Sequence, residues 1–236
     1  MALKLTSPTD AIVIHSRPYG EGREIVEFLT ESRGKISGVR RLSKRNGFQR
    51  LQPFTIGHLS LSGRSSLLTV SSFDFVGRFV LIGDRVASGF YILELLQKLI
   101  VEGEPDSRIY RAVYQVLDGL SGPDPMEPLL RVFELEFLSV LGYGIDLDHE
   151  GFSGEKIYEE KFYCFMPEQG FYEVNADSKN CILGKDILAV SNEMVLTNEV
   201  ALNLLKKIVR NVIDSLLNGK LLTSRKLIIK RPVKDK

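Results

Sequence analysis

The chain has 236 residues, 44% hydrophobic and 26% charged, which suits one large or two small globular domains with a self-sufficient core. Only Cys164 and Cys181 are present, and they match no C-x-x-C spacing, so the sequence argues against a disulfide framework and for a reducing cytoplasm. No apolar run has the length of a secretory signal or a membrane span, so we expect a cytoplasmic protein outside the membrane.

The formal net charge of +1 conceals an uneven distribution. Residues 1–80 carry a net charge of +6, residues 81–205 carry −13, and residues 206–236 carry +8. No acidic residue lies between Glu31 and Asp74. Such asymmetry favours a polyanion-binding surface held apart from an acidic body, although cations can also cluster on a solvated face.

The first third of the chain predicts short strands, at residues 11–16, 23–30, 35–39, about 51–63 and 65–80. Five strands at this spacing indicate a small barrel rather than βαβ units. Between the first two lies RPYGEG, residues 17–22, which is either a tight turn that needs glycine or a phosphate-binding loop. The densest cations fall on the connection between the third and fourth strands, at the rim of such a barrel.

From about residue 80 the hydrophobic period changes to that of helices. The first helix is predicted to bury a stripe of Ile82, Val86, Phe90, Leu93, Leu96 and Ile100. A second helix is expected over 107–120, a third from about Pro128 to Leu141, and a last one from an N-cap at Thr197 to Gly219. The glycine-rich stretch from 143 to about 195 is predicted to be an irregular insertion.

The sequence supports no catalytic site. It lacks the P-loop, dinucleotide and nucleophile-elbow motifs. Its three histidines, His15, His58 and His149, are scattered and suit structural or solvated roles. The segment 146–150, DLDHE, has carboxylates spaced for a hard cation, but it lacks a full calcium-loop pattern and also fits a solvated acidic turn. The residues alone therefore offer no positive case for an enzyme, and a small hydrolase with a dispersed site stays open.

Several segments occur in an order that is familiar: RPYGEG at 17–22, FLTESRGKISGVRRLSKR at 28–45, LQPF at 51–54, LLRVFELEFLSVLGYG at 129–144, and the pair Ser224-Arg225. From about residue 11 to 227, this order resembles the RecO family of bacterial DNA repair and recombination mediators. The resemblance implies an α+β protein in which an N-terminal five-stranded OB-fold barrel, at 1–80, binds nucleic acid. A mainly helical C-terminal domain, at 81–236, would carry a small zinc-finger-like insertion at about 143–195.

The same resemblance implies a function. Members bind single- and double-stranded DNA, anneal complementary strands, and act with RecR to help load RecA onto strands coated by the single-stranded-DNA-binding protein. They also contact the acidic C-terminal tail of that protein, they work in the cytoplasm at the nucleoid, and they are not enzymes. Many members carry four cysteines in the insertion, whereas this chain has two, so we expect no bound zinc and no other cofactor. Apolar packing of Phe162, Phe165, Phe171 and Tyr172 is expected to hold the insertion instead.

Two sets of residues are candidates for binding. Phosphate contacts release counterions and give affinity that is independent of sequence, and OB-folds add aromatic platforms for bases. The nucleic-acid-binding candidates are therefore Arg33, Lys35, Arg40, Arg41, Lys44, Arg45, Phe48 and Arg50. For the acidic tail we expect Lys206, Lys207 and Arg210 on the last helix, with Leu202 and Ile213 beside them at the edge of its apolar stripe. The basic rim of the barrel is an alternative site. An RNA-binding OB-fold protein of translation is the alternative function.

Overall fold

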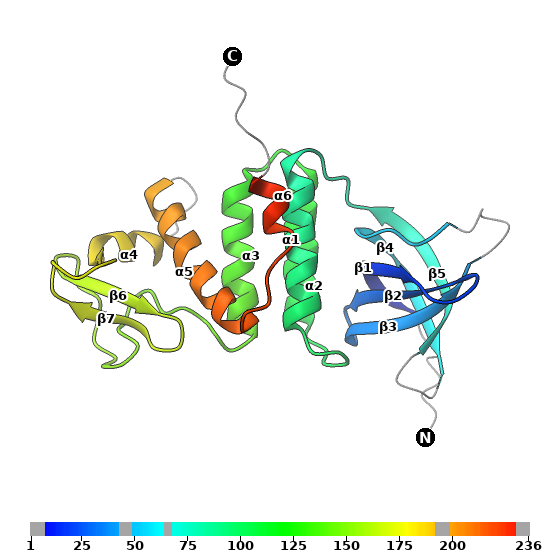
Figure 1. Cartoon of the computed structure of the whole chain (residues 1–236), viewed down its shortest axis with the longest axis horizontal. Coiled ribbons are helices and arrows are strands. Elements are labelled where there is room, and N and C mark those ends of the chain that lie inside the picture. Colours follow the sequence, from blue (N-terminus) through cyan, green and yellow to red (C-terminus); the bar gives the residue numbers. More distant parts are fainter. Residues whose placement is uncertain (1–7, 43–48, 64–67, 192–198, 230–236) are drawn as a thin grey trace, which may run out of the picture. The chain divides into compact units, whose positions relative to one another are not determined.

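The computed structural model describes residues 8–42, 49–63, 68–191 and 199–229. The chain forms two compact units: residues 1–123 together with 222–236, and residues 124–221. The predicted boundary at residue 80 falls within the first unit, between its strands and its helices, and the domain assignment made from the sequence stays a prediction. Figure 1 labels the elements along the chain.

The first unit begins with a closed five-stranded barrel, as predicted. Its strands are β1 (Thr9–Pro18), β2 (Arg23–Thr30), β3 (Gly34–Arg41), β4 (Thr55–Ser62) and β5 (Leu68–Arg78). They follow the order β1-β2-β3-β5-β4, and β1 pairs with β4 to close the barrel. All pairings are antiparallel except that of β3 with β5, which gives the OB-fold arrangement.

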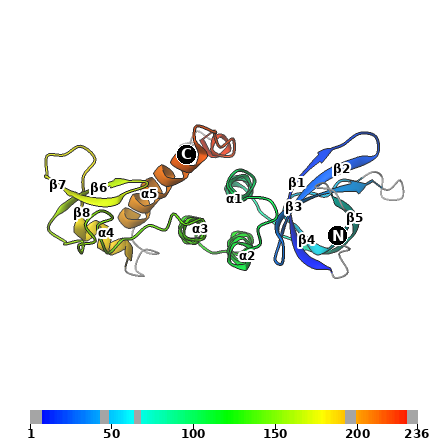
Figure 2. The same ribbon diagram turned by 90° about the horizontal axis from the view of Figure 1, so that it is seen from below.

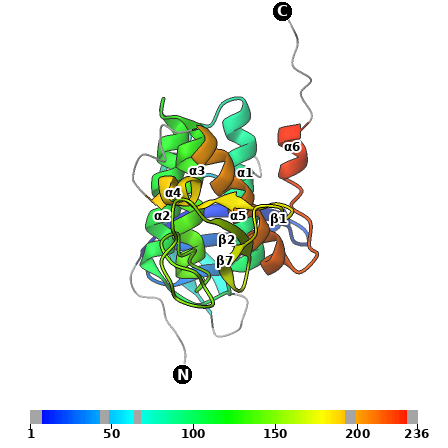
Figure 3. The same ribbon diagram turned by 90° about the vertical axis from the view of Figure 1, so that its left-hand side faces the viewer.

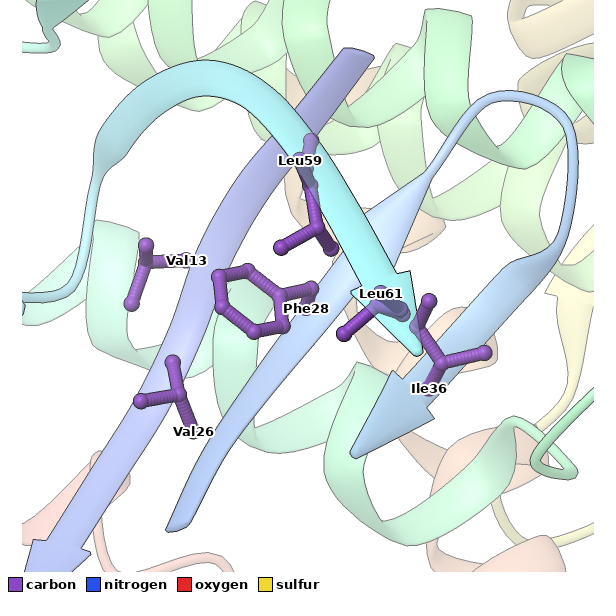
Figure 4. Packing of buried hydrophobic residues seen from close by; sticks show 7 residues of the cluster. Val13, Val26, Phe28, Ile36, Leu59 and Leu61 are labelled. Atoms are coloured by element: carbon purple, nitrogen blue, oxygen red, sulfur yellow. The ribbon is translucent and has the colours of Figure 1, made fainter. Parts of the chain in front are cut away.

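The interior of the barrel is filled by side chains at alternate strand positions. Figure 4 shows Val13, Val26, Phe28, Leu59 and Leu61 converging in this interior. Phe28 is fully buried and its ring lies 5.7 Å from that of Phe73. This core fixes the register of the β2–β3 hairpin, because a shift of one residue would turn its apolar side chains outward.

Three helices complete the first unit: α1 (Asp84–Leu99), α2 (Ser107–Ser121) and α6 (Arg225–Ile229). Asp106 caps α2, since its carboxylate accepts a hydrogen bond from the Arg108 N–H. The stripe predicted for α1 was partly wrong. Ile82 and Phe90 are exposed, whereas the buried side includes Tyr91, Ile92 and Leu95, because neighbours on two sides bury more of this helix than a single stripe.

The second unit contains α3 (Met126–Val140), β6 (Phe162–Met166), β7 (Gly170–Val174), β8 (Ile182–Leu183), α4 (Gly184–Ser191) and α5 (Glu199–Leu217). The strands form a sheet in the order β7-β6-β8, labelled in Figure 2. α5 packs against both α3 and α4 (Figure 3). The predicted N-cap of the last helix, Thr197, lies outside the described residues.

The insertion has regular structure around an apolar core. Tyr163 and Phe171 are fully buried in it with Ile187, and Phe165 packs edge-on to Phe171 at 5.0 Å. Phe162 and Tyr172, also expected to hold the core, lie at positions that alternate with the buried ones and are only half-buried. Whether the insertion is zinc-finger-like stays a prediction.

Candidate nucleic-acid interface

The β1–β2 turn and the end of β3 bring arginines together. Arg23 opens β2 and lies opposite Arg41, the last residue of β3, while Arg17 comes just before the turn. All three are exposed. The turn between them depends on Gly20 and Gly22, which both have φ of 61°, a conformation that favours glycine. RPYGEG therefore forms a tight turn, and this turn presents cations on both sides.

Arg40 completes this surface from inside the barrel mouth. Its Nη1 donates to Glu24 Oε1 at 2.8 Å and to the Gln49 carbonyl at 3.2 Å. Glu24 is completely buried, and its Oε1 also accepts from the Leu51 N–H at 3.3 Å. The Arg40–Glu24 pair therefore connects the segment 49–51 to the β2–β3 hairpin through hydrogen bonds. We call Arg17, Arg23, Arg40, Arg41 and Arg50 the arginine end of the barrel, where Arg50 is exposed on that segment.

Tyr19 is an aromatic side chain at the arginine end that the sequence analysis did not select. It is 41% exposed at the tip of the turn, and the Arg23 guanidinium lies 5.6 Å from its ring centroid. Stacking on a guanidinium limits the freedom of the ring without covering both of its faces. The signal that could have identified Tyr19 is an aromatic residue inside a predicted turn, because a side chain at the tip of a turn does not pack in the barrel core.

Lys35 lies away from the arginine end. Its Nζ donates to the carbonyls of Leu96 and Gln97 at 3.2 and 2.9 Å, at the C-terminal end of α1. Burial lowers the pKa of Lys35, while Glu27 and Glu102 oppose that shift. Gln97 in turn donates to Glu27 at 3.1 Å. These contacts partly cover the outer face of β2 and β3, which many OB-folds use for oligonucleotides, so we leave Lys35 out of the proposed interface.

The remaining candidates divide into two groups. Arg33 lies in the β2–β3 turn, at the opposite end of the hairpin from Arg41. Its N–H donates to Thr30 Oγ1 at 3.1 Å. Lys44, Arg45 and Phe48 lie outside the described residues, and their assignment rests on the sequence alone.

The cations expected to bind an acidic tail lie on α5 in the second unit. Lys206 Nζ donates a hydrogen bond to Glu127 Oε1 at 2.7 Å, whereas Lys207 and Arg210 are exposed. Ile213 was expected at the edge of the apolar stripe, and this was wrong, because it is fully buried. Leu202 is half-buried and stays available as an apolar neighbour.

The titratable groups weighed as catalytic or metal-binding candidates have local structural partners. His58 Nδ1 lies 2.7 Å from Asp10 Oδ1, and His149 Nδ1 lies 3.3 Å from Asp146 Oδ2. Burial raises the pKa of Asp146, but hydrogen bonds from the Asp148 and His149 N–H groups outweigh it and lower that pKa. Among the described residues, no three histidine, cysteine or acidic side chains come together as a metal site.

Comparison with known proteins agrees with this architecture. The family model described as Recombination protein O N terminal matches residues 3–79, and that described as Recombination protein O C terminal matches residues 83–221. The chain belongs to the RecO family. Its RecO relatives, each named DNA repair protein RecO, include a Psychromonas ingrahamii protein that is 33% identical over 92% of this chain and 96% of its own length.

Two further RecO relatives cover a similar span. The Cellvibrio japonicus protein is 33% identical over 92% of this chain and 94% of its own length. The Pseudoalteromonas atlantica protein is 32% identical over 91% of each chain. The two RecO family models meet between β5 and α1, where the barrel gives way to helices. Within the described part of this RecO chain, no helix combines the length and the apolarity needed to cross a bilayer.

Proposed function

We propose that this protein is a DNA repair and recombination mediator that binds single- and double-stranded DNA through the arginine end of its barrel. The observation that carries the proposal is that exposed Arg17 and Arg23 flank the β1–β2 turn of an OB-fold, and that exposed Arg41 of β3 lies opposite Arg23. The β1–β2 loop is one of the places where OB-folds bind oligonucleotides. The relatives are each named DNA repair protein RecO, and this name supports DNA as the ligand.

In this proposal an arginine either contacts phosphate or positions its neighbours, depending on its place in the barrel. Arg17, Arg23, Arg41 and Arg50 contact phosphates, joined by Lys44 and Arg45 from the sequence. Arg40 is a positioning residue, because its guanidinium is committed to the buried Glu24 and to the Gln49 carbonyl. Tyr19 supplies a ring on which one base stacks, in the role that the sequence analysis gave to Phe48. Stacking of this kind is tolerant of sequence, since every base has a π face.

Strand annealing follows from the same surface. Two DNA strands repel each other through their phosphates, and a dense set of guanidinium groups reduces this repulsion while the strands pair. Base pairing itself supplies the driving free energy, so we propose that the protein anneals strands without nucleotide hydrolysis and is not an enzyme. From the family resemblance we further propose that it acts at the nucleoid with RecR to load RecA onto strands coated by the single-stranded-DNA-binding protein.

We place the acidic tail of the single-stranded-DNA-binding protein on α5. Lys207 and Arg210 are the exposed cations there, with Leu202 as an apolar neighbour. Lys206 takes part only if the tail displaces Glu127. A peptide titration tests the assignment by comparing Lys207→Ala/Arg210→Ala with Arg23→Ala/Arg41→Ala. Loss of peptide affinity only in the second variant would move the tail to the arginine end.

An annealing assay without nucleotide tests the proposed function. Complementary DNA strands are mixed with the wild-type chain or with the variant Arg17→Ala/Arg23→Ala/Arg41→Ala, and duplex formation is followed by fluorescence. We expect the wild-type chain to accelerate annealing and the variant to lose most of this effect. A wild-type chain that binds structured RNA tightly and leaves DNA annealing unchanged would favour an RNA-binding protein of translation instead.

A further inference from the structure

The two cysteines of the chain lie across from each other in the second unit. β6 pairs antiparallel with β8 through Phe162 with Leu183 and Tyr163 with Ile182. If this register is continued by one step, Cys164 of β6 falls opposite Cys181, the residue just before β8. The chain has no other cysteine.

Both thiols lie on the outer face of the small sheet. Tyr163 and Phe171 point into the core of the unit and are fully buried. Cys164 lies opposite Tyr172 in β7 and alternates with Tyr163, so it belongs to the other face. Both cysteines are free and half-buried. Reagents of small size can therefore reach both sulfurs.

The sulfur atoms point at the same stretch of backbone. Cys164 Sγ donates to the Lys179 carbonyl at 3.6 Å, and Cys181 Sγ donates to the Ala176 carbonyl at 3.4 Å. Both carbonyls belong to the connection between β7 and β8. Two thiols that lie on facing positions and share one short loop are held near each other in the folded chain.

This placement suits a disulfide. Directly opposed residues of an antiparallel pair have Cα atoms about 4.5 to 5.5 Å apart, within the range of about 4.4 to 6.8 Å that disulfides span. A tetrahedral metal site needs more ligands, and no group of three such side chains occurs within residues 8–42, 49–63, 68–191 and 199–229. We propose that Cys164 and Cys181 are a redox modification site that closes reversibly to an intramolecular disulfide.

The oxidant is a low-molecular-weight disulfide such as oxidised glutathione. One cysteine thiolate attacks a sulfur of the small disulfide, forms a mixed disulfide and releases one small thiol. The second cysteine then attacks the protein sulfur of the mixed disulfide and releases the second small thiol. The protein loses two electrons and two thiol protons, and the small disulfide gains both. A reversible bond of this kind is compatible with a reducing cytoplasm, where transient disulfides are redox-sensing or catalytic.

Peptide mapping tests the proposal on the full chain. The reduced, folded protein is incubated with oxidised glutathione at about pH 8, where thiolate is available, then alkylated and digested with trypsin. Cleavage after Lys161, Lys179 and Lys185 separates Cys164, in peptide 162–179, from Cys181, in peptide 180–185. We expect these two peptides to be recovered joined, at the summed mass less two hydrogen atoms, and to separate on reduction.

Matched variants and an unfolded sample serve as controls. Cys164→Ser and Cys181→Ser each leave one thiol, so each is expected to stop at the glutathione mixed disulfide. Incubation in denaturant is expected to slow closure at least tenfold, since the fold no longer holds the thiols together. Three results would overturn the proposal: stable mixed disulfides on both cysteines of the wild-type chain, closure equally fast in denaturant, or one zinc per chain in the reduced protein on elemental analysis.

Discussion

Glu94 in α1 holds Ser224, a residue 130 positions further along the chain, through two hydrogen bonds. The Ser224 hydroxyl donates to Glu94 Oε2 at 2.6 Å and its backbone N–H donates at 2.9 Å. Thr223 donates in the same two ways to Oε1. The chain leaves the first unit after Pro123 and returns at Leu222, so this carboxylate fixes the point of return and satisfies the N–H groups of the two residues that precede α6.

Glu94 is expected to make stability depend on acid pH. Burial raises the pKa of Glu94, but the hydrogen bonds from Ser224 and Thr223 outweigh it and lower the pKa from 4.5 to about 2. A depressed carboxyl pKa stabilises the fold fully above about pH 4.5 and loses this contribution as the pH falls toward 2. This shift in the pKa of Glu94 corresponds to a contribution of about 3 kcal/mol to the free energy of unfolding.

Glu94→Gln should therefore lower the free energy of unfolding near neutral pH and flatten its dependence below pH 4.5. Denaturant titrations between about pH 3 and 7 measure both effects. Glu104→Gln, at an exposed position of the same unit, is the control and should change neither. Parallel pH curves for wild type and Glu94→Gln would contradict the prediction.

Arg40→Ala is predicted to destabilise the barrel rather than merely weaken DNA binding. It leaves the buried Glu24 without its cation, which typically costs about 3–5 kcal/mol. The neighbouring Arg41→Ala, at an exposed position, should change stability by about 0.5 kcal/mol or less. Thermal unfolding compares the two, and Glu24→Gln/Arg40→Ala should recover part of the loss because no unpaired charge stays buried.

The arginine end is predicted to set the salt dependence of DNA binding. Each phosphate contact with a single strand contributes about 0.7 to the log–log slope of affinity against salt. Arg17→Ala/Arg23→Ala/Arg41→Ala should reduce that slope by about 2. Arg33→Ala, from the other end of the hairpin, is the single-charge control and should leave it unchanged. If the triple variant keeps the wild-type slope while folded, phosphate binding lies elsewhere.

Tyr19 is predicted to act by stacking, which salt barely affects. Tyr19→Ala should lower single-strand affinity by about 1–3 kcal/mol, the usual cost of removing one aromatic platform. The salt slope should stay at the wild-type value, which separates this effect from those of the arginines. Tyr19→Phe keeps the ring and should retain most of the affinity. Equal losses in both variants would assign the effect to the hydroxyl instead.

Gly34 and Gly22 are predicted to differ as sites for alanine. Both have positive φ, of 66° and 61°, so alanine is strained by about 1 kcal/mol at either one. A Cβ at Gly34 would also clash with the Glu104 carbonyl, whereas a Cβ at Gly22 would meet nothing within 4 Å. Gly34→Ala should therefore cost at least about 1–3 kcal/mol more than Gly22→Ala in unfolding experiments. Similar losses of unfolding free energy in the two variants would show that the backbone at Glu104 shifts to make room for the added Cβ.

The sequence alone determined the barrel, the main helices and the cationic character of the N-terminal third. Alternating apolar residues such as Val26 and Phe28 specify strands because side chains on a strand alternate between faces. The helical period specifies α3 and α5 for the analogous reason. Local pattern also identified the β1–β2 turn, since Gly20 and Gly22 adopt a backbone conformation that few other residues accept.

Only the tertiary structure decided which cations share a surface. Arg23 and Arg41 meet because the β2–β3 register aligns them, although they are 18 positions apart in the sequence. Lys35 is withdrawn because its ammonium donates to carbonyls at the C-terminal end of α1. The same holds for Glu24 with Arg40, for Glu94 with Ser224 and for Cys164 with Cys181. Periodicity reports which face of an element a side chain occupies. It carries no information about which other element covers that face, because that depends on packing between segments far apart in the chain.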